Sequence, residues 1–351
     1  MTRTITNIII LSILLAGLLT FLHAPRSTTA HVSLNHITAG PSLNHITVGF
    51  SIDSLARVDN AARSDVDTAI IYGKAFTPSD PVGAEMQAKG MTEIDAGISS
   101  ELFYYECHRT HTVAPPRKGT PNTFCATDEK PWINSESVVL SDVNAMLKAD
   151  AVNPLIRGYW VLDDWVLWDA GSAKTILQAI HNHIQQYTPS YPAICGFGLA
   201  IVRPNSTTWN PRIAQNYSNA GCDMVGIYSY VSTYPSAKDG SQFDFTMKTG
   251  LAAAFQSLRQ LGWSIHNTPL LGIGQAFAGP YGRTRYEPGI TSTQMTTQAK
   301  AFCKAGATSI GWYAWDDSGF GAKTLTPMTS AEVQDGITSS MSACQAVWEG
   351  Q

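Results

Sequence analysis

The amino-acid sequence predicts an α/β protein whose large domain is a (β/α)8 TIM barrel. Eight short apolar runs alternate with helical patterns over about 300 residues, which is the element count of this barrel. The run from Ile156 to Trp165 reads IRGYWVLDDW, and the run from Ser309 to Asp317 reads SIGWYAWDD. Both have the form of a buried parallel strand that delivers carboxylates to one end of a sheet. The two runs therefore predict two walls of one pocket.

An open, doubly wound sheet is the main alternative fold. That fold would place a glycine-rich phosphate-binding turn after the first strand. The sequence there, Phe50 to Ser54, reads FSIDS and lacks this fingerprint. Gly272 and Gly274 lie inside a strand pattern and indicate close packing rather than a nucleotide site. The closed barrel is therefore the better interpretation.

Residues 1–30 have the pattern of a signal peptide or an N-terminal anchor. Arg3 supplies a positive charge, and an apolar run extends from Ile8 to Leu22. Cleavage is expected after Ala24 or Ala30, which predicts a secreted, extracellular protein. The apolar run is also close to the length that spans a bilayer, so without cleavage the protein would stay anchored.

A short tandem duplication follows the N-terminal segment. Residues 33–40 read SLNHITAG, and residues 42–49 read SLNHITVG. Two copies are too few for a repeat fold. Residues 31–47 are therefore interpreted as a linker with His36 and His45 at the surface, and residues 48–351 as the barrel domain.

The expected elements follow from apolar β-branched runs for strands and from amphipathic patterns for helices. Pro81 fits the first turn of a helix. The expected strands are Val48–Ile52, Thr68–Tyr72, Met91–Asp95, the run from Ile156, Ala193–Val202, Met224–Val231, Leu270–Phe277 and the run from Ser309. The expected helices are Ser54–Ala62, Pro81–Lys89, Ser172–Gln186, Phe243–Leu261, Thr293–Ala305 and Ser330–Val347.

A long segment after the third strand, up to about Val143, contains several prolines and few periodic positions. A loop of this length is usually functional, or else it conceals a missed element. We expect a disulfide between Cys107 and Cys125 to close it.

The six cysteines are predicted to form disulfides because the protein is expected to be exported. Pairing of nearest neighbours joins Cys107 to Cys125. It also joins Cys195 to Cys222 and Cys303 to Cys344. The alternative for Cys107 is a thiolate or a metal ligand beside His108 and His111, but no second cysteine or acid lies at a suitable spacing.

The composition is that of a globular protein with an aromatic-lined cleft. It contains 13 tyrosines, 12 phenylalanines and 9 tryptophans, with 14% charged residues and a net charge of −4. Without a basic run, nucleic-acid binding has no electrostatic basis. We expect a monomer without a metal or a cofactor, which does not contact the membrane once the signal peptide is removed.

Acids and aromatic rings gather at the carboxyl ends of the expected strands. The apolar faces of sugars stack on such rings, and two carboxylates cleave glycosidic bonds. The residues at these strand ends are Asp53, Asp95, Asp163, Asp164, Trp165, Tyr228, Tyr230, Gln275, Trp315, Asp316 and Asp317.

The fourth-strand motif GYWVLDDW and the eighth-strand motif GWYAW resemble those of (β/α)8 glycoside hydrolases of the clan-A-like type. This resemblance implies a secreted enzyme that cleaves glycosidic bonds in a poly- or oligosaccharide. By position it assigns the acid/base role to Asp164. Enzymes of this superfamily often end the seventh strand with a nucleophilic glutamate, whereas this sequence has Gln275 there.

Strand alternation predicts which carboxylates face the pocket. Gly158, Trp160, Leu162 and Asp164 share one face, as do Gly311, Tyr313, Trp315 and Asp317. On this basis Asp164 is the expected general acid and Asp317 its expected partner, followed by Asp316 or Asp53. Asp163 and Asp316 would then lie beside the pocket or cap helices.

The remaining residues at the strand ends receive supporting roles. Tyr228 and Gln275 are expected to orient the substrate. Trp165, Trp209, Tyr230 and Trp315 are expected to stack on sugar rings, and Trp160 and Trp312 to fill the core.

Two other functions fit the same residues. Gln275 motivates a carbohydrate-binding TIM barrel that has lost catalysis. Clustered aspartates could instead bind Ca²⁺ or Mg²⁺ in a metal-dependent hydrolase, although no histidine joins them.

Overall fold

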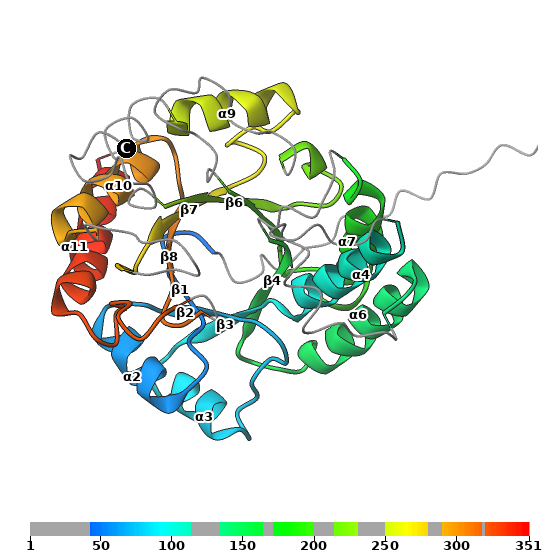
Figure 1. Cartoon of the computed structure of the whole chain (residues 1–351), viewed down its shortest axis with the longest axis horizontal. Coiled ribbons are helices and arrows are strands. Elements are labelled where there is room, and N and C mark those ends of the chain that lie inside the picture. The colour runs from blue at the N-terminus through cyan, green and yellow to red at the C-terminus, as the bar shows by residue number, and fades with distance from the viewer. Residues whose placement is uncertain are drawn as a thin grey trace, which may run out of the picture. The chain divides into compact units, whose positions relative to one another are not determined.

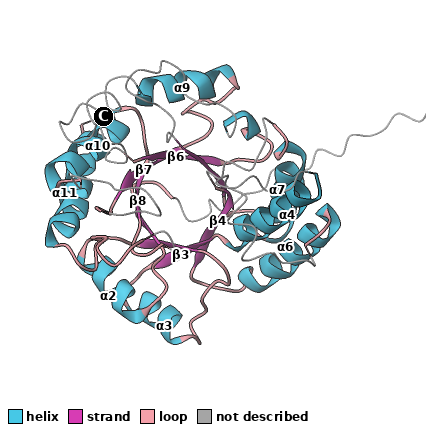
Figure 2. Ribbon diagram, viewed as in Figure 1, coloured by secondary structure: helices cyan, strands magenta, loops and turns pink. Residues whose placement is uncertain are grey.

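The computed structural model describes residues 43–113, 133–163, 171–198, 214–230, 250–279, 290–317 and 320–350. All of them belong to one compact unit, Ala39–Gln351. Eight parallel strands form a closed barrel in the order β1 to β8, and the helices surround this ring of strands (Figure 1; Figure 2). The predicted (β/α)8 fold is therefore confirmed.

Each strand lies within an apolar run that was predicted from the sequence or within one residue of it. The strands are β1 (Thr47–Phe50), β2 (Thr68–Ile71), β3 (Thr92–Asp95), β4 (Ile156–Leu162), β5 (Ala193–Gly198), β6 (Met224–Ser229), β7 (Leu270–Gln275) and β8 (Ser309–Tyr313). Parallel pairing of β1 with β8 closes the barrel.

Most helices also agree with the sequence pattern. They are α2 (Leu55–Arg63), α3 (Pro81–Ala88), α4 (Gly97–Val113), α6 (Glu136–Asp150), α7 (Lys174–Tyr187), α9 (Leu251–Gln260), α10 (Ser292–Lys304) and α11 (Ala331–Trp348), with a 3-10 turn η2 at Ala214–Asn216. None of the described helices combines the length and the apolar character needed to cross a membrane.

The described parts of the long segment after the third strand form α4 and α6. The expectation of an irregular loop is therefore wrong for these parts, and the alternative of a missed element is confirmed. In α6, Ser135 caps the first turn by accepting a hydrogen bond from the Val138 N–H. Val139, Val143 and Leu147 recur every four residues and are buried. This helical period begins only after the proline-rich stretch, which explains why the segment looks irregular as a whole.

The barrel interior is filled by large side chains from the inward-facing positions of the strands. Trp160 of β4 is fully buried there and contacts Phe50 and Tyr228 edge-to-face, with ring centroids 5.6 and 5.9 Å away. Gly196 of β5 and Gly226 of β6 lie against its indole. A Cβ atom on Gly226 would be 2.6 Å from Trp160 Cη2. The glycines thus leave the space that the indole fills, and Trp160 is a core residue as predicted.

Substituting Gly226→Ala is expected to lower the free energy of unfolding by about 1 to 3 kcal/mol, because the added methyl group overpacks the barrel interior. Urea denaturation measures this change. The control Gly350→Ala, near the C-terminus, is expected to change stability by less than about 0.5 kcal/mol. Equal stability of Gly226→Ala and wild type would show that the interior has room around Trp160.

Two of the three predicted disulfides are confirmed. Cys195 in β5 is bonded to Cys222, and Cys303 in α10 is bonded to Cys344 in α11. Cys107 in α4 is also disulfide-bonded, which excludes the alternative of a free thiolate or metal ligand. Its predicted partner, Cys125, lies outside the described residues.

The described part of the second copy of the duplicated segment packs into the barrel and continues into β1. Leu43 and Ile46 are buried with the interior residues. His45 is exposed, as predicted, and stacks on Trp348 with ring centroids 4.5 Å apart. The first copy and the N-terminal segment lie outside the described residues.

Candidate active site

Asp163 directly follows β4, and its side chain lies at the mouth of the barrel. Its Oδ2 accepts a hydrogen bond of 2.7 Å from the Tyr72 hydroxyl, and its Oδ1 accepts one of 2.9 Å from the Tyr228 hydroxyl. Both tyrosines pack with the interior residues. Asp163 is only 4% exposed. Each carboxylate oxygen is therefore fixed by a phenol from a different strand region, after β2 and in β6.

A bulge in β4 turns Asp163 inward. The register between β4 and β5 shifts between Trp160 and Leu162, so that Trp160 faces the interior while Leu162 packs in the outer core. An extra residue in a strand reverses the alternation that follows it. The expectation that Leu162 faces inward and that Asp163 lies beside the pocket is therefore wrong. Asp164, the predicted general acid, lies outside the described residues.

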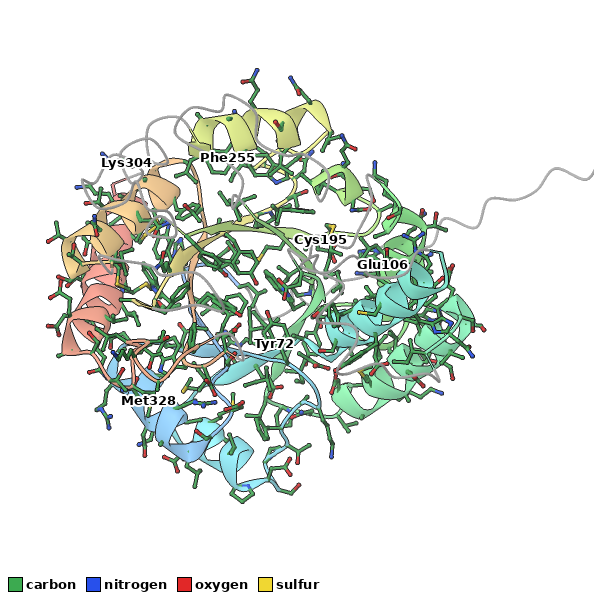
Figure 3. All side chains as sticks on the ribbon, viewed as in Figure 1. Tyr72, Glu106, Cys195, Phe255, Lys304 and Met328 are labelled. Atoms are coloured by element: carbon green, nitrogen blue, oxygen red, sulfur yellow. A yellow bond between two sulfur atoms is a disulfide. The ribbon has the colours of Figure 1, made fainter. Side chains whose placement is uncertain are left out.

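Tyr72 is a site residue to which sequence reasoning gave no role. It follows Ile70 by two positions, and Ile70 faces the barrel interior. Alternation along the second strand could have placed Tyr72 on the same inward face. Figure 3 shows Tyr72 on the inner side of the ring of strands.

Asp317 lies on the other wall of the mouth, four residues beyond the end of β8. Its carboxylate accepts a hydrogen bond from the Tyr313 hydroxyl. The Tyr313 ring lies 6.0 Å from the Tyr228 ring and 5.6 Å from the Tyr230 ring, measured between centroids. The tyrosines that bind Asp163 and Asp317 are thus in contact. We call the cluster of rings formed by Tyr228, Tyr230 and Tyr313 the aromatic floor, and both carboxylates are hydrogen-bonded to it.

This aromatic floor continues over β7 and the segment after β8. Phe277 lies 5.7 Å from Tyr230 and 5.2 Å from Phe320, between ring centroids. Tyr230 and Phe320 are partly exposed, whereas Phe277 is fully buried. The predicted stacking residue Tyr230 therefore packs against Tyr228 and Tyr313, the tyrosines whose hydroxyls bind Asp163 and Asp317.

Gln275 ends β7 and is fully buried. Its Nε2 donates a 2.7 Å hydrogen bond to the Phe277 carbonyl oxygen. The inward positions of β7 before it are Leu271 and Ile273, so Gln275 follows the same alternation.

Asp53 and Asp316 are both exposed and share one cation. The Arg57 guanidinium, in α2, forms ion pairs with both carboxylates. Asp53 and Asp316 are the two residues that the sequence offered as alternatives to Asp317 for the second carboxylate. Their salt bridges to Arg57 connect the segment after β1 with the segment after β8.

Trp315 does not line the mouth, contrary to the sequence-based expectation. It is 2% exposed, and its Nε1 donates a 2.8 Å hydrogen bond to Asn60 of α2. Strand alternation ends at Tyr313, and Ala314 packs with the interior residues, so the next side chain turns outward. Trp312 is a buried core residue, as predicted. Trp165 and Trp209 lie outside the described residues.

Asp95 points away from the mouth, which corrects its placement among the site residues. It lies in the layer between the barrel and the helices, where the Gly97 N–H donates a 2.7 Å hydrogen bond to its carboxylate. Glu93 and Asp150 are buried in the same layer. Burial, and then the charge of Asp95, raise the pKa of Glu93 to about 9. Burial is also the main cause of the raised pKa of Asp95 and of Asp150.

The mouth offers carboxylates, phenols and aromatic rings. Among the described residues, no group of three or more histidines, cysteines or acids could bind a metal ion. The chemistry that these side chains support directly is proton transfer and charge stabilisation by carboxylates.

Among the comparisons with known proteins, only the comparison with solved structures finds similar proteins. No protein-family model matches the sequence, and no curated protein matches it. The β-galactosidase from the psychrophilic Marinomonas ef1 superposes with a TM-score of 0.57 at 10% identity, over 87% of this chain and 60% of that one. The chain therefore spans less than two thirds of the length of that enzyme.

Two β-glucuronidases match with lower scores. The enzyme from Ruminococcus gnavus has a TM-score of 0.49 at 10% identity, over 87% of this chain and 49% of that one. The enzyme from Lactobacillus rhamnosus has a TM-score of 0.49 at 10% identity, over 80% of this chain and 45% of that one. The β-galactosidase match therefore shows that this chain shares the barrel fold.

Proposed function

We propose that the barrel is a glycoside hydrolase that cleaves glycosidic bonds in a poly- or oligosaccharide. The observation that carries this proposal is the pair of carboxylates at the mouth. Asp163 is bound by two tyrosine hydroxyls and Asp317 by a third, and the phenol rings contact one another. Two carboxylates on facing walls are what hydrolysis of a glycosidic bond requires.

Asp163 suits the role of base or nucleophile. An ionised carboxylate is purely an acceptor, and both hydroxyls donate to Asp163. Asp317, on the other wall of the mouth, is the proposed proton donor. Asp164, which the resemblance designates as general acid, is the alternative proton donor.

Gln275 stands where related enzymes often have their nucleophile. An amide cannot carry the negative charge that stabilises a sugar cation, so this charge must come from elsewhere in the mouth. Asp163 supplies it in our proposal. Tyr230 is the proposed stacking surface for the sugar ring, because it is partly exposed and its ring contacts Tyr228 and Tyr313, which bind the two carboxylates.

The proposed site of action is outside the cell, for a monomer released by signal-peptide cleavage. The disulfides Cys195–Cys222 and Cys303–Cys344 support export, because disulfides persist in oxidising compartments.

The test is release of reducing ends from a panel of plant, fungal and bacterial polysaccharides by the wild-type protein. Binding to the same glycans is measured in parallel by calorimetry. Turnover of at least one glycan, lost in Asp317→Asn but retained in the surface control Asp335→Asn, supports the proposal. Absence of both turnover and binding on the whole panel would contradict it.

A sugar-binding barrel without catalysis is the second candidate, and Gln275 favours it. This function predicts binding to one glycan without release of reducing ends. It also predicts that Asp163→Asn and Asp317→Asn keep most of the affinity, since the aromatic floor would provide the binding energy.

A further inference from the structure

The segment that carries Asp317 is anchored to the first helix of the barrel. Beyond β8, the Trp315 N–H donates a 3.0 Å hydrogen bond to the Phe50 carbonyl oxygen of β1. Two side chains of α2, three residues apart, reach the same segment. Asn60 accepts from the Trp315 indole, and Arg57 pairs with Asp316. The helix after the first strand thus fixes the loop after the last strand.

Asp316 connects Arg57 to the backbone of Asp317. One oxygen of Asp316, Oδ1, accepts a 2.9 Å hydrogen bond from the Asp317 N–H. The other, Oδ2, accepts from the Arg57 guanidinium. Arg57 in turn is fixed by Asp53, four residues earlier in the chain. Each link is a direct contact, from Asp53 through to the residue whose carboxylate meets Tyr313.

The ion pairs of Arg57 with Asp53 and Asp316 contribute to the position of these side chains more than to the stability of the fold. The side chains of Asp53 and Asp316 are 48% and 51% exposed, and exposed ion pairs contribute little to stability. A guanidinium is planar, however, and fixes two carboxylates in a defined geometry, which a single ammonium group cannot do. With its side chain 22% exposed, Arg57 is more shielded from water than either acid.

We propose that Arg57 is a positioning residue for Asp317. It keeps the Asp316 carboxylate where that group accepts the Asp317 N–H, and so sets the direction in which the Asp317 carboxylate meets Tyr313 and the substrate. This inference rests on the proposed function, in which Asp317 is the second carboxylate.

The test compares Arg57→Met with Arg63→Met on the glycan that the wild-type protein hydrolyses best. Arg63 is an exposed residue of the same helix, so both variants remove one positive charge from α2. Arg57→Met is expected to lower kcat about 10- to 100-fold, with KM changed less than about 2-fold, because small misplacements of a reacting group have effects of this size. Arg57→Lys is expected to recover part of kcat. Arg63→Met is expected to match the wild type.

Hydrogen exchange gives a readout that does not depend on turnover. The peptide that carries Asp317 is expected to exchange faster in Arg57→Met than in Arg63→Met, while the peptides from α10 and α11 exchange alike in both. A purely structural role of Arg57 would instead lower the melting temperature and speed exchange throughout the barrel.

The outcomes separate this inference from the function on which it rests. Wild-type turnover with equal kcat in Arg57→Met and Arg63→Met would overturn the positioning role alone. Faster local exchange without a change in kcat would also overturn it. Absence of wild-type turnover on every glycan would overturn the proposed function, and the positioning role with it.

Discussion

Replacing Asp163 with asparagine is expected to lower kcat/KM by about 1,000-fold or more, since general acid–base groups contribute about 10² to 10⁴ in rate. Asparagine has the same shape but cannot accept a proton or carry a charge. Its amide nitrogen also cannot accept from a tyrosine hydroxyl, so either Tyr72 or Tyr228 must reorient. We expect a loss of stability of only about 1 kcal/mol. Steady-state kinetics and thermal melting measure the two effects.

The control for this substitution is Asp335→Asn on the exposed face of α11, which is expected to leave both quantities unchanged. Comparing the activity of Asp163→Asn with that of Asp164→Asn decides which of the two adjacent aspartates acts in catalysis. Full activity of Asp163→Asn together with an inactive Asp164→Asn would show that Asp164 acts and that Asp163 is structural.

Stability is expected to fall as the pH rises from about 5 to 9. Glu93 has an ordinary pKa of 4.5 when unfolded and a pKa of about 9 in the fold, because it is buried. Between these pH values the folded protein binds a proton that the unfolded chain does not, so the free energy of unfolding decreases with increasing pH. The raised pKa values of Asp95 and Asp150 act in the same direction. The loss expected from Glu93 alone is about 3 to 6 kcal/mol over this range.

The variant Glu93→Gln tests the origin of this pH dependence. Glutamine is neutral at every pH and retains an oxygen that can accept from the Phe76 N–H, as Glu93 does at 3.1 Å. Urea denaturation at pH 5, 7 and 9 is expected to show a shallower loss of stability than in the wild type, with the variant the more stable protein at pH 9. The control Glu349→Gln, exposed at the end of α11, is expected to keep the wild-type slope. An unchanged slope in Glu93→Gln would exclude Glu93 as its source.

The fold was predictable because each strand is a local apolar run. Parallel strands that are buried on both faces need no partner information to be recognised, and the runs at Ile156 and Ser309 became β4 and β8. Helix α4 was not predictable in the same way. Its sequence, GISSELFYYECHRTHTV, mixes polar and aromatic residues on all sides, so no apolar stripe identifies it.

The sequence predicted which strand ends form the site, but it did not predict which side chains at those ends point into the mouth. Asp163 and Asp317 were selected because they follow apolar strands, and both lie at the mouth. Which of two adjacent aspartates faces inward depends on the bulge in β4, which is a property of pairing with β5 and not of β4 alone. Trp315 was misplaced for a related reason, since β8 ends at Tyr313 and the alternation stops there.

The most direct test of the central claim is chemical rescue of Asp163→Gly by azide. The substrate is an activated aryl glycoside of the sugar that the wild-type protein hydrolyses. Azide supplies the anionic charge that the missing carboxylate provided, so our account predicts restored release of the aryl group in Asp163→Gly and a glycosyl azide product. Rescue of Asp164→Gly instead, with Asp163→Gly retaining wild-type turnover before azide is added, would contradict the assignment of Asp163 as the charged group of the site.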